Sequence, residues 1–488
     1  MQTLKNNSLK INALLSMVNT FLTMAFSLIT YPYAARVLQV DNLGKVNYTN
    51  SIVAYFALFA ALGFNTYAIR EGSKYRYDKE KLNTFASQIF SFNLVTAIIS
   101  YCLLCFVVSN NLSLHMYWKL ITIQSLVIFT NLIGVNWINV VFEDYLFITI
   151  RSILVQIISI ILLFIFVKQS QDYYIFAFII VASNCIVSLL NFIYIRRYCK
   201  IKIVVNINIR KYIKPVLVFF SNTLAVSIYV NSDTTMLGWY LGNYSVGLYS
   251  VAVKIYTAIR SMLAAVYSVA IPRMSRYVAE NNLQLFKDLM NKIINTIIFI
   301  AIPITIGVST ASKEMILLLS GPSYTSAQGA LVLLAFALLF AILGGTLAYC
   351  VDIPLGYEKK VMFATVLSAI ENVVLNFFFI PILGIIGTSL TTLLSEVTVF
   401  LALILGLKNH WFLFDIKSIS INFLKSIIAA IPIIYIKRGL DTCIYDDKYF
   451  VKLILYFILS VITYIFLGLI LKSRTLLSII KNIFKKVI

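Results

Sequence analysis

Long apolar stretches dominate this chain of 488 residues and leave it few folds to choose from. Hydrophobic residues make up 60% of the sequence and charged residues only 12%, and the charges gather between the apolar runs. A helix needs about 20 apolar residues to cross a bilayer, and within lipid a helix satisfies its own backbone hydrogen bonds. The sequence predicts an all-α polytopic membrane protein with about fourteen transmembrane helices, at 11–37, 46–67, 84–108, 116–141, 147–167, 174–195, 216–237, 248–271, 293–311, 327–351, 362–382, 385–405, 418–436 and 451–471.

The placement of the basic residues predicts the orientation of the spans. A formal net charge of +21 would suit a nucleic-acid-binding protein, but Lys and Arg lie in short loops beside the apolar runs. If the N-terminus is cytoplasmic, 28 of the 40 fall in cytoplasmic segments, nine in external ones and three inside spans. Cytoplasmic loops of membrane proteins carry such an excess. We therefore expect both termini in the cytoplasm and no nucleic acid among the partners.

The two halves of the chain repeat each other. Leu38–Asn47 matches Leu241–Ser250, and Ala68–Tyr75 matches Ala270–Tyr277 after a slip of one residue. Six spans separate each span from its repeat partner, and this even number predicts a parallel repeat with a pseudo-two-fold axis along the membrane normal. We expect an N-terminal six-helix lobe at 1–205, a C-terminal six-helix lobe at 206–408, and two additional helices with a basic cytoplasmic tail at 409–488.

Polar residues recur every three or four positions along span one and along its repeat partner, span seven. This spacing places them on one face of a helix. Such side chains either bond packed membrane helices together or line a hydrophilic cavity. Because the stripe runs the length of span one and returns in span seven, we favour the cavity. Its predicted polar residues are Asn12, Asn19, Thr23 and Asn231.

Charged residues inside spans are costly, so they are candidates for function. They are Asp233, Lys254, Arg260, Glu371, Glu396 and Lys425. We assign Asp233, Lys254, Arg260 and Glu371 to the predicted cavity, together with Arg36 at the end of span one. A structural ion pair between Asp233 and Lys254, and a protonated packing role for Glu371, remain alternatives. The first half has no carboxylate deep in its spans, which argues against a pump for cationic drugs.

Cysteine and histidine supply no further site. The six cysteines follow no disulfide framework, and Cys102 and Cys105, although spaced as in a redox motif, lie within a span. The two histidines are far apart, so no metal site is expected. The first apolar run, from Ile11 to Tyr31, is too long for the core of a signal peptide.

Several segments resemble one known family. They are Tyr31–Leu38, Ser51–Phe56, Ser232–Gly247, Ile271–Ser275, Leu319–Gly321, Asn376–Phe377 and Ile380–Pro381. In order and spacing they resemble the polysaccharide-transporter family of the multidrug/oligosaccharidyl-lipid/polysaccharide (MOP) exporter superfamily, and more narrowly the O-antigen and capsule repeat-unit flippases. Two residues depart from the pattern: Gln39 stands where such sequences usually carry Gly, and Val141 where a small residue is usual.

The resemblance implies a function as well as a fold. It implies export of undecaprenyl-diphosphate-linked oligosaccharide repeat units across the bacterial cytoplasmic membrane by alternating access. Partners would be this lipid-linked substrate, membrane lipids, and the polysaccharide polymerase and chain-length machinery. No cofactor is expected, and coupling to H⁺ or Na⁺ is left open. Basic residues suit the diphosphate, because Lys and Arg make charge-assisted bonds to phosphate oxygens.

Two other functions remain alternatives. The first is a cation-coupled multidrug exporter of the same superfamily, against which the two extra C-terminal spans and the acid-free first half count. The second is a membrane polysaccharide polymerase, which would be an enzyme. A polymerase would present its catalytic groups on a sizeable external loop, and the predicted external loops are short. We therefore expect a transporter rather than an enzyme.

Overall fold

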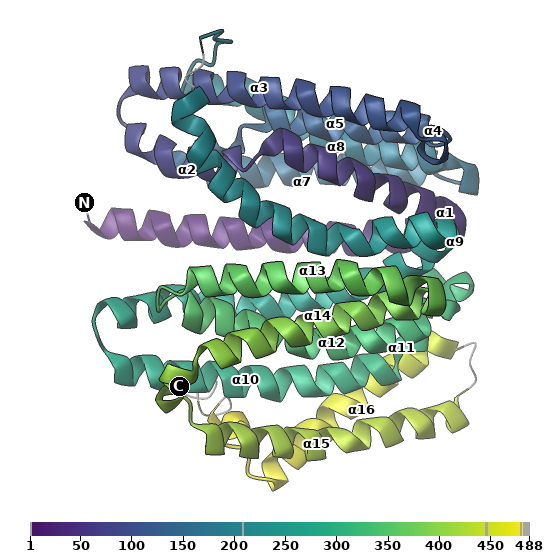
Figure 1. The fold of residues 1–488 in the computed structure, drawn as a ribbon. Helices are drawn as coiled ribbons and strands as arrows, with labels where there is room; N and C mark the ends of the chain where they lie inside the picture. The colour runs from purple at the N-terminus through teal and green to yellow at the C-terminus, as the bar shows by residue number, and fades with distance from the viewer. Residues whose placement is uncertain (1, 207–208, 445–447, 479–480, 482–488) are drawn as a thin grey trace. The chain divides into compact units, whose positions relative to one another are not determined.

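The computed structural model describes residues 2–206, 209–444, 448–478 and 481, and this part of the chain is helical without β-strands (Figure 1). Each of the fourteen predicted spans corresponds to a helical segment. Two helices account for two spans each, since α1 (Gln2–Ala61) and α9 (Ile209–Ala279) each consist of two helical parts joined at a kink. Eleven helical stretches among the described residues are long and apolar enough to cross a membrane. The prediction of an all-α, multi-pass membrane protein is confirmed. The predicted basic tail lies largely outside the described residues.

The chain divides into two compact units, Met1–Gly238 and Trp239–Ile488, so the division falls within α9. The predicted lobe boundaries and the two-fold relation between the lobes stay predictions. The other helices of the first unit are α2 (Phe64–Gly72), α3 (Lys79–Asn110), α4 (Leu112–His115), α5 (Trp118–Gly134), α6 (Asn136–Val141), α7 (Tyr145–Phe166) and α8 (Tyr173–Tyr194). Those of the second unit are α10 (Leu283–Thr310), α11 (Ser312–Ser320), α12 (Gln328–Leu347), α13 (Glu358–Leu383), α14 (Ile385–Gly406), α15 (Ile416–Cys443) and α16 (Tyr449–Ile470).

In the first unit, α1 runs through the helix packing and contacts α3, α5 and α7, while α5 and α7 both pack on α8 (Figure 1). Hydroxyl and amide groups join these helices through backbone carbonyls. Thr96 Oγ1 of α3 donates to the Ala60 carbonyl over 2.7 Å, and Gln124 Nε2 of α5 donates to the Val46 carbonyl over 2.9 Å. Since membrane helices gain little from apolar burial against lipid, such bonds help to fix their packing.

An aromatic core closes one end of the first unit. Phe85 of α3 lies edge-on to Trp137 of α6 and to Tyr212 of α9, with ring centroids 5.8 and 6.2 Å apart, and all three side chains are buried. Gly72 at the end of α2 makes this approach possible, because a Cβ there would lie 2.7 Å from the Trp137 ring. The core therefore connects α2, α3, α6 and the beginning of α9.

The corner between α5 and α7, where Val141 departs from the family pattern, is held by polar contacts. The Tyr194 and Tyr198 hydroxyls donate to Asp144 Oδ2 over 2.7 and 2.8 Å, and Arg197 pairs with the same oxygen. Burial raises the pKa of Asp144, but the tyrosine hydrogen bonds and the Arg197 charge outweigh burial, so the pKa lies below its ordinary value. Asp144 is therefore ionised and ties the end of α8 to the beginning of α7.

In the second unit the helices follow each other in a simple packing order. α13 packs on α14, α14 on α12, α12 on α10, α10 on α15, and α15 on α16 (Figure 1). Asn282 and Asp415 cap α10 and α15 by accepting from the Leu285 and Ser418 amides, as such residues do at helix N-termini. The two C-terminal helices thus join the unit mainly through α10 and its continuation α11.

Candidate substrate site and apolar groove

The predicted polar stripe of α1 takes part in helix packing over at least part of its length. Thr23 Oγ1 donates to the Asn19 carbonyl over 2.8 Å and accepts from Gln156 Nε2 of α7 over 3.1 Å. Asn12 and Asn19 are half-buried and Thr23 is exposed. The buried Oδ1 of Asn19 has no hydrogen-bond partner among the described residues. The Thr23 contact is thus of the helix-joining kind, while the cavity lined by this stripe stays a prediction.

The first part of α9 holds its polar residues close to the second part of α1. Thr235 Oγ1 donates to Ser51 Oγ over 2.8 Å, and Asn231 Nδ2 donates to the Ser227 carbonyl over 2.9 Å. Asp233 is buried, with 6% of its surface exposed. A Cβ at Gly238 would lie 2.1 Å from the Tyr48 ring of α1, so the two helices approach closely there. The cavity role of Asp233 stays a prediction, with a structural ion pair to Lys254 as its alternative.

Arg36 lies in α1, just before the kink at Gln39. Its side chain is exposed, and its carbonyl accepts from Gln39 Nε2 over 2.8 Å. α1 bends at Gln39 (φ 65°, ψ 172°), and α9 bends at Gly242 (φ 76°, ψ −174°). The exposure suits a cation that meets a head group, but its role stays a prediction.

Arg260 has a partner that sequence reasoning did not assign. Its Nη1 lies 2.9 Å from Glu396 Oε1 of α14, and the Tyr256 hydroxyl donates to the same carboxylate oxygen over 3.0 Å. The Arg260 side chain is 36% exposed while that of Glu396 is 4% exposed. Glu396 therefore anchors a guanidinium whose other face is accessible. Sequence showed both charges within spans, but their separation of 136 residues gave no reason to pair them.

Glu371 lies beside a fully buried amide pair. Asn376 Nδ2 donates to Asn372 Oδ1 over 3.2 Å, and Thr391 Oγ1 of α14 donates to Asn376 Oδ1 over 2.6 Å. Both asparagines have 0% of their surface exposed, whereas Glu371 is half-buried. The amides therefore join α13 to α14, and the Glu371 carboxylate is outside that network.

A large apolar groove lies within the second unit and was not predicted. It has a volume of about 850 Å³ and runs between the second part of α9, α10, α15 and α16. Aliphatic and aromatic side chains dominate its lining, among them Met262, Phe299, Pro303, Phe457 and Ile465. Protein interiors are otherwise close-packed, so a groove of this size is not a packing fault. Its apolar lining suits a hydrocarbon chain.

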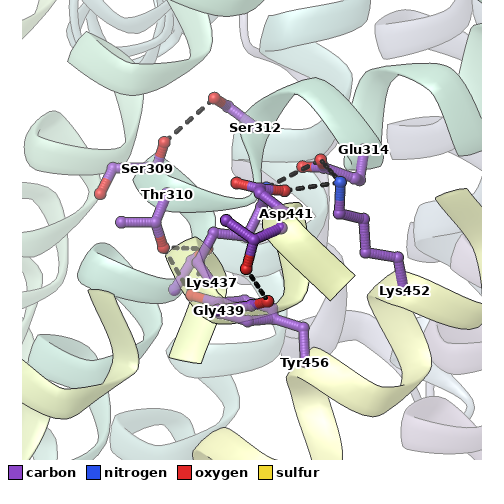
Figure 2. A network of polar contacts seen from close by, with 11 residues as sticks. Ser309, Thr310, Ser312, Glu314, Lys437, Gly439, Asp441, Lys452 and Tyr456 are labelled. Carbon is purple, nitrogen blue, oxygen red and sulfur yellow. Dashed lines mark hydrogen bonds and ion pairs between the residues drawn. The ribbon is translucent and has the colours of Figure 1, made fainter. Parts of the chain in front are cut away.

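An ion cluster, in which Lys437, Lys452 and Glu314 are buried and Asp441 is exposed, lies beside the groove. Figure 2 shows its contacts. Lys437 Nζ of α15 lies 2.8 Å from Glu314 Oε1 of α11 and 2.6 Å from Asp441 Oδ1, and Lys452 Nζ of α16 lies 2.6 Å from Asp441 Oδ1. Ala311 and Met315, which line the groove, flank Glu314 in sequence. The cluster joins α11, α15 and α16. Sequence reasoning placed Lys437 and Lys452 in external loops, although the spacing of Lys437 and Asp441 was a helical signal.

Tyr456 connects the cluster to the groove wall. Its hydroxyl bonds to Thr310 at the end of α10, and Figure 2 shows both residues in the same polar network as Lys437. Further along α16, the Tyr464 hydroxyl donates to the Phe299 carbonyl over 2.7 Å. Hydrogen bonds therefore connect α16 to α10 at two positions along the helices. The apolar lining of the groove lies along this contact.

The comparisons with known proteins agree with this architecture. Residues 9–278, more than half of the chain, match the family described as "Polysaccharide biosynthesis protein". The chain is 25% identical over 391 residues to the "Putative O-antigen transporter" of Escherichia coli K12, an alignment that covers 78% of this chain and 92% of the relative. This relative is named as a transporter, which supports the prediction that the chain is not an enzyme.

Two solved structures share the fold. The lipid II flippase MurJ in an inward closed conformation superposes with a TM-score of 0.76 at 18% identity, covering 96% of this chain and all of the other. An inward-facing multidrug resistance transporter of the MATE family and MOP superfamily gives a TM-score of 0.59 at 17% identity, covering 80% of this chain and 94% of the other. The chain thus belongs to the polysaccharide biosynthesis protein family and has the fold of the MOP superfamily.

Proposed function

We propose that this protein is a flippase that moves undecaprenyl-diphosphate-linked oligosaccharide repeat units, of an O-antigen or a capsule, across the bacterial cytoplasmic membrane. The apolar groove of the second unit carries the proposal, because a transporter of water-soluble substrates has no use for about 850 Å³ of hydrocarbon-lined space beside its bundle. The O-antigen relative and the lipid II flippase, whose names give a glycan and a lipid-linked substrate, support it.

The groove would take the lipid part of the substrate. A polyprenyl chain is apolar throughout, and its transfer into an apolar lining gains about 25 cal/mol for each Å² removed from water. In a bilayer this gain is smaller, since lipid also solvates the chain, so the groove would guide the tail rather than hold it tightly. Weak retention suits a transporter, which must release its cargo on the far side.

The sugar-diphosphate head would travel along the polar stripes and basic residues. A diphosphate carries at least two negative charges, and moving them through an apolar interior without compensation is prohibitive. Arg260 offers an accessible guanidinium anchored by Glu396. Arg36 and Lys254 are the further cations of the proposed route, with Asn12, Asn19, Thr23 and Asn231 as its neutral polar wall. Alternating access would expose this route to one side at a time.

The test is to identify the lipid that accompanies the protein and to measure its movement. We expect native mass spectrometry of the purified protein to show a bound polyprenyl-diphosphate saccharide. Proteoliposomes that contain such a lipid in one leaflet should move it to the other faster than protein-free vesicles. Protein that carries ordinary phospholipids alone and leaves the saccharide lipid in its original leaflet would overturn the proposal.

The groove itself has a separate test. Gly307 lines it, and a Cβ there would meet only the Tyr456 hydroxyl, at 3.9 Å. Gly307→Leu should fill part of the groove with little strain. We expect this variant to accumulate normally but to move the saccharide lipid more slowly. A variant that transports at the wild-type rate would show that the groove does not take the lipid tail.

A further inference from the structure

A buried acid without a partner lies at the end of α12. Asp352 has 0% of its surface exposed, and neither of its carboxylate oxygens has a hydrogen-bond partner among the described residues. Asp352 also has no ion pair among the described residues. Burying an unpaired carboxylate costs several kcal/mol or more. Burial without a partner therefore favours the neutral form of the carboxyl over the charged one.

The backbone around Asp352 is unusual too. Ala348–Asp352 forms a π-helical turn, in which the Ile353 amide donates to the Ala348 carbonyl five residues earlier, over 2.9 Å. The Tyr357 amide in turn donates to the Asp352 carbonyl over 2.8 Å. Single π-turns are uncommon and occur frequently at functional sites. Such a turn can rewind into an α-helix, which would rotate the Asp352 side chain into new surroundings.

The titratable groups on the surrounding described elements have partners other than Asp352, as the Tyr357 hydroxyl does, 3.3 Å from His410 Nε2. Lys360 of α13 acts electrostatically on Asp352, but its ammonium donates to the Gly406 carbonyl at the end of α14 over 2.9 Å. Tyr349 of the π-turn stacks on Tyr267 of α9, with centroids 5.4 Å apart. Glu396 of α14 is paired with Arg260. Cys350 is buried with its thiol 4.0 Å from the Tyr267 carbonyl. None of these contacts satisfies the carboxyl.

We propose that Asp352 is a proton-binding site, loaded in this conformation, that releases its proton to water when the π-turn rearranges. A metal or sodium ion is a poor alternative, because hard cations need several oxygen ligands, no metal-binding group of His, Cys, Asp or Glu occurs among the described residues, and Ala348, Cys350 and Val351 in the same turn are apolar and buried. A proton needs no further ligand.

The site can communicate with the proposed substrate route. Tyr267, which stacks on the π-turn, is within electrostatic range of both Arg260 and Glu396. A rearrangement of the turn would therefore move a ring that is within electrostatic range of this ion pair. The use of the proton to drive transport rests on the proposed function, whereas proton binding itself does not.

The first experiment measures proton binding without a transport assay. If the folded protein holds the proton and the unfolded chain releases it, stability falls as the pH rises. The melting temperature of the wild-type protein in detergent should therefore drop between about pH 5 and about pH 8. Asp352→Asn, which is neutral at every pH, should lack this drop. The control is Glu358→Gln, at an exposed acid in the first turn of α13, and it should behave as the wild type. Equal pH dependence of the wild type and Asp352→Asn would overturn the proposal.

The second experiment measures coupling in proteoliposomes that contain a polyprenyl-diphosphate saccharide. Wild-type transport should accelerate when a pH gradient is imposed, and Asp352→Asn should lose that acceleration while Glu358→Gln keeps it. If Asp352→Asn still responds to the gradient, the coupling role is wrong although the flippase function stands. If the wild type moves no saccharide lipid, the proposed function fails, and the pH-dependent melting still decides whether Asp352 binds the proton.

Discussion

Gln39 and Gly242 occupy the same position in the two sequence repeats and have nearly the same backbone conformation. Their φ angles are 65° and 76°, and their ψ angles, 172° and −174°, differ by 14° across 180°. This region of φ and ψ is essentially reserved for glycine. The kink between spans one and two and that between spans seven and eight therefore have one geometry, which Gly242 adopts without strain and Gln39 does not.

Replacing Gln39 should stabilise the protein. A non-glycine residue in this conformation costs about 1–3 kcal/mol, and Gln39→Gly removes that cost while losing one hydrogen bond to the Arg36 carbonyl. We expect a net gain of about 1 kcal/mol, visible as a higher melting temperature in detergent. Gln39→Ala is the matched control, since it loses the same bond and keeps the strain. If both variants melt alike, strain at Gln39 is not the cause.

A close approach between α13 and α14 gives a second prediction. A Cβ at Gly387 would lie 2.3 Å from the Phe379 carbonyl oxygen, which is backbone and cannot rotate away. Gly387→Ala should therefore separate the two helices and lower the amount of folded protein in the membrane. A Cβ added at Gly439 in α15 would have no neighbouring atom within 4 Å. Gly439→Ala should be neutral or stabilising by up to about 1 kcal/mol, and the comparison is made by fluorescence-detected size exclusion.

The ion cluster predicts a large and specific loss of stability. Glu314→Gln would remove a buried negative charge that lies 2.8 Å from Lys437 and 3.9 Å from the buried Lys452. Breaking a buried pair by removing one partner costs about 3–5 kcal/mol. The exposed pair of Asp78 and Lys81 is the comparison, because solvent screens such a pair and Asp78→Asn should hardly change the stability. Thermal melting measures both, and similar small losses would show that the cluster is hydrated.

Arg260 and Glu396 can be separated into structural and transport roles. If Arg260 serves the diphosphate, Arg260→Ala should abolish glycan export and Arg260→Lys should keep part of it. Arg260→Ala also leaves the buried Glu396 unpaired, so its protein level should fall. The double variant Arg260→Ala/Glu396→Gln should restore the protein level without restoring export. Export at the wild-type rate from the double variant would show that the pair is structural only.

Topology is the remaining prediction, since orientation rests on charge bias alone. Reporter fusions after Asn206 should read cytoplasmic, and fusions after Asn243, just beyond the α9 kink, should read external. The opposite pair of readings would invert the orientation of every helix and place the proposed substrate route on the wrong side for export.

The sequence predicted what depends on local composition and missed what depends on tertiary packing. Apolar runs of the right length located the fourteen helical segments, whereas the kink at Gln39 was not predicted. Lys437 and Lys452 were assigned to loops because charge is expensive in lipid, yet both side chains are buried and each is paired with Asp441. The groove could not be anticipated, because residues as distant as Met262 and Phe457 form it together. Asp352 follows the apolar run of α12, and only its burial sets it apart.

The packing order of the second unit also separates two kinds of selectivity. α15 and α16 contact the remaining helices mainly through α10 and α11. α15 and α16 also supply one wall of the groove. The cationic candidates Arg36, Lys254 and Arg260 all lie outside them. Under the proposed function, changes in α15 and α16 would alter which lipid carrier is accepted without altering which glycan is recognised. A family built in this way can adapt to a new anchor and to a new sugar independently, by mutations in different parts of the chain.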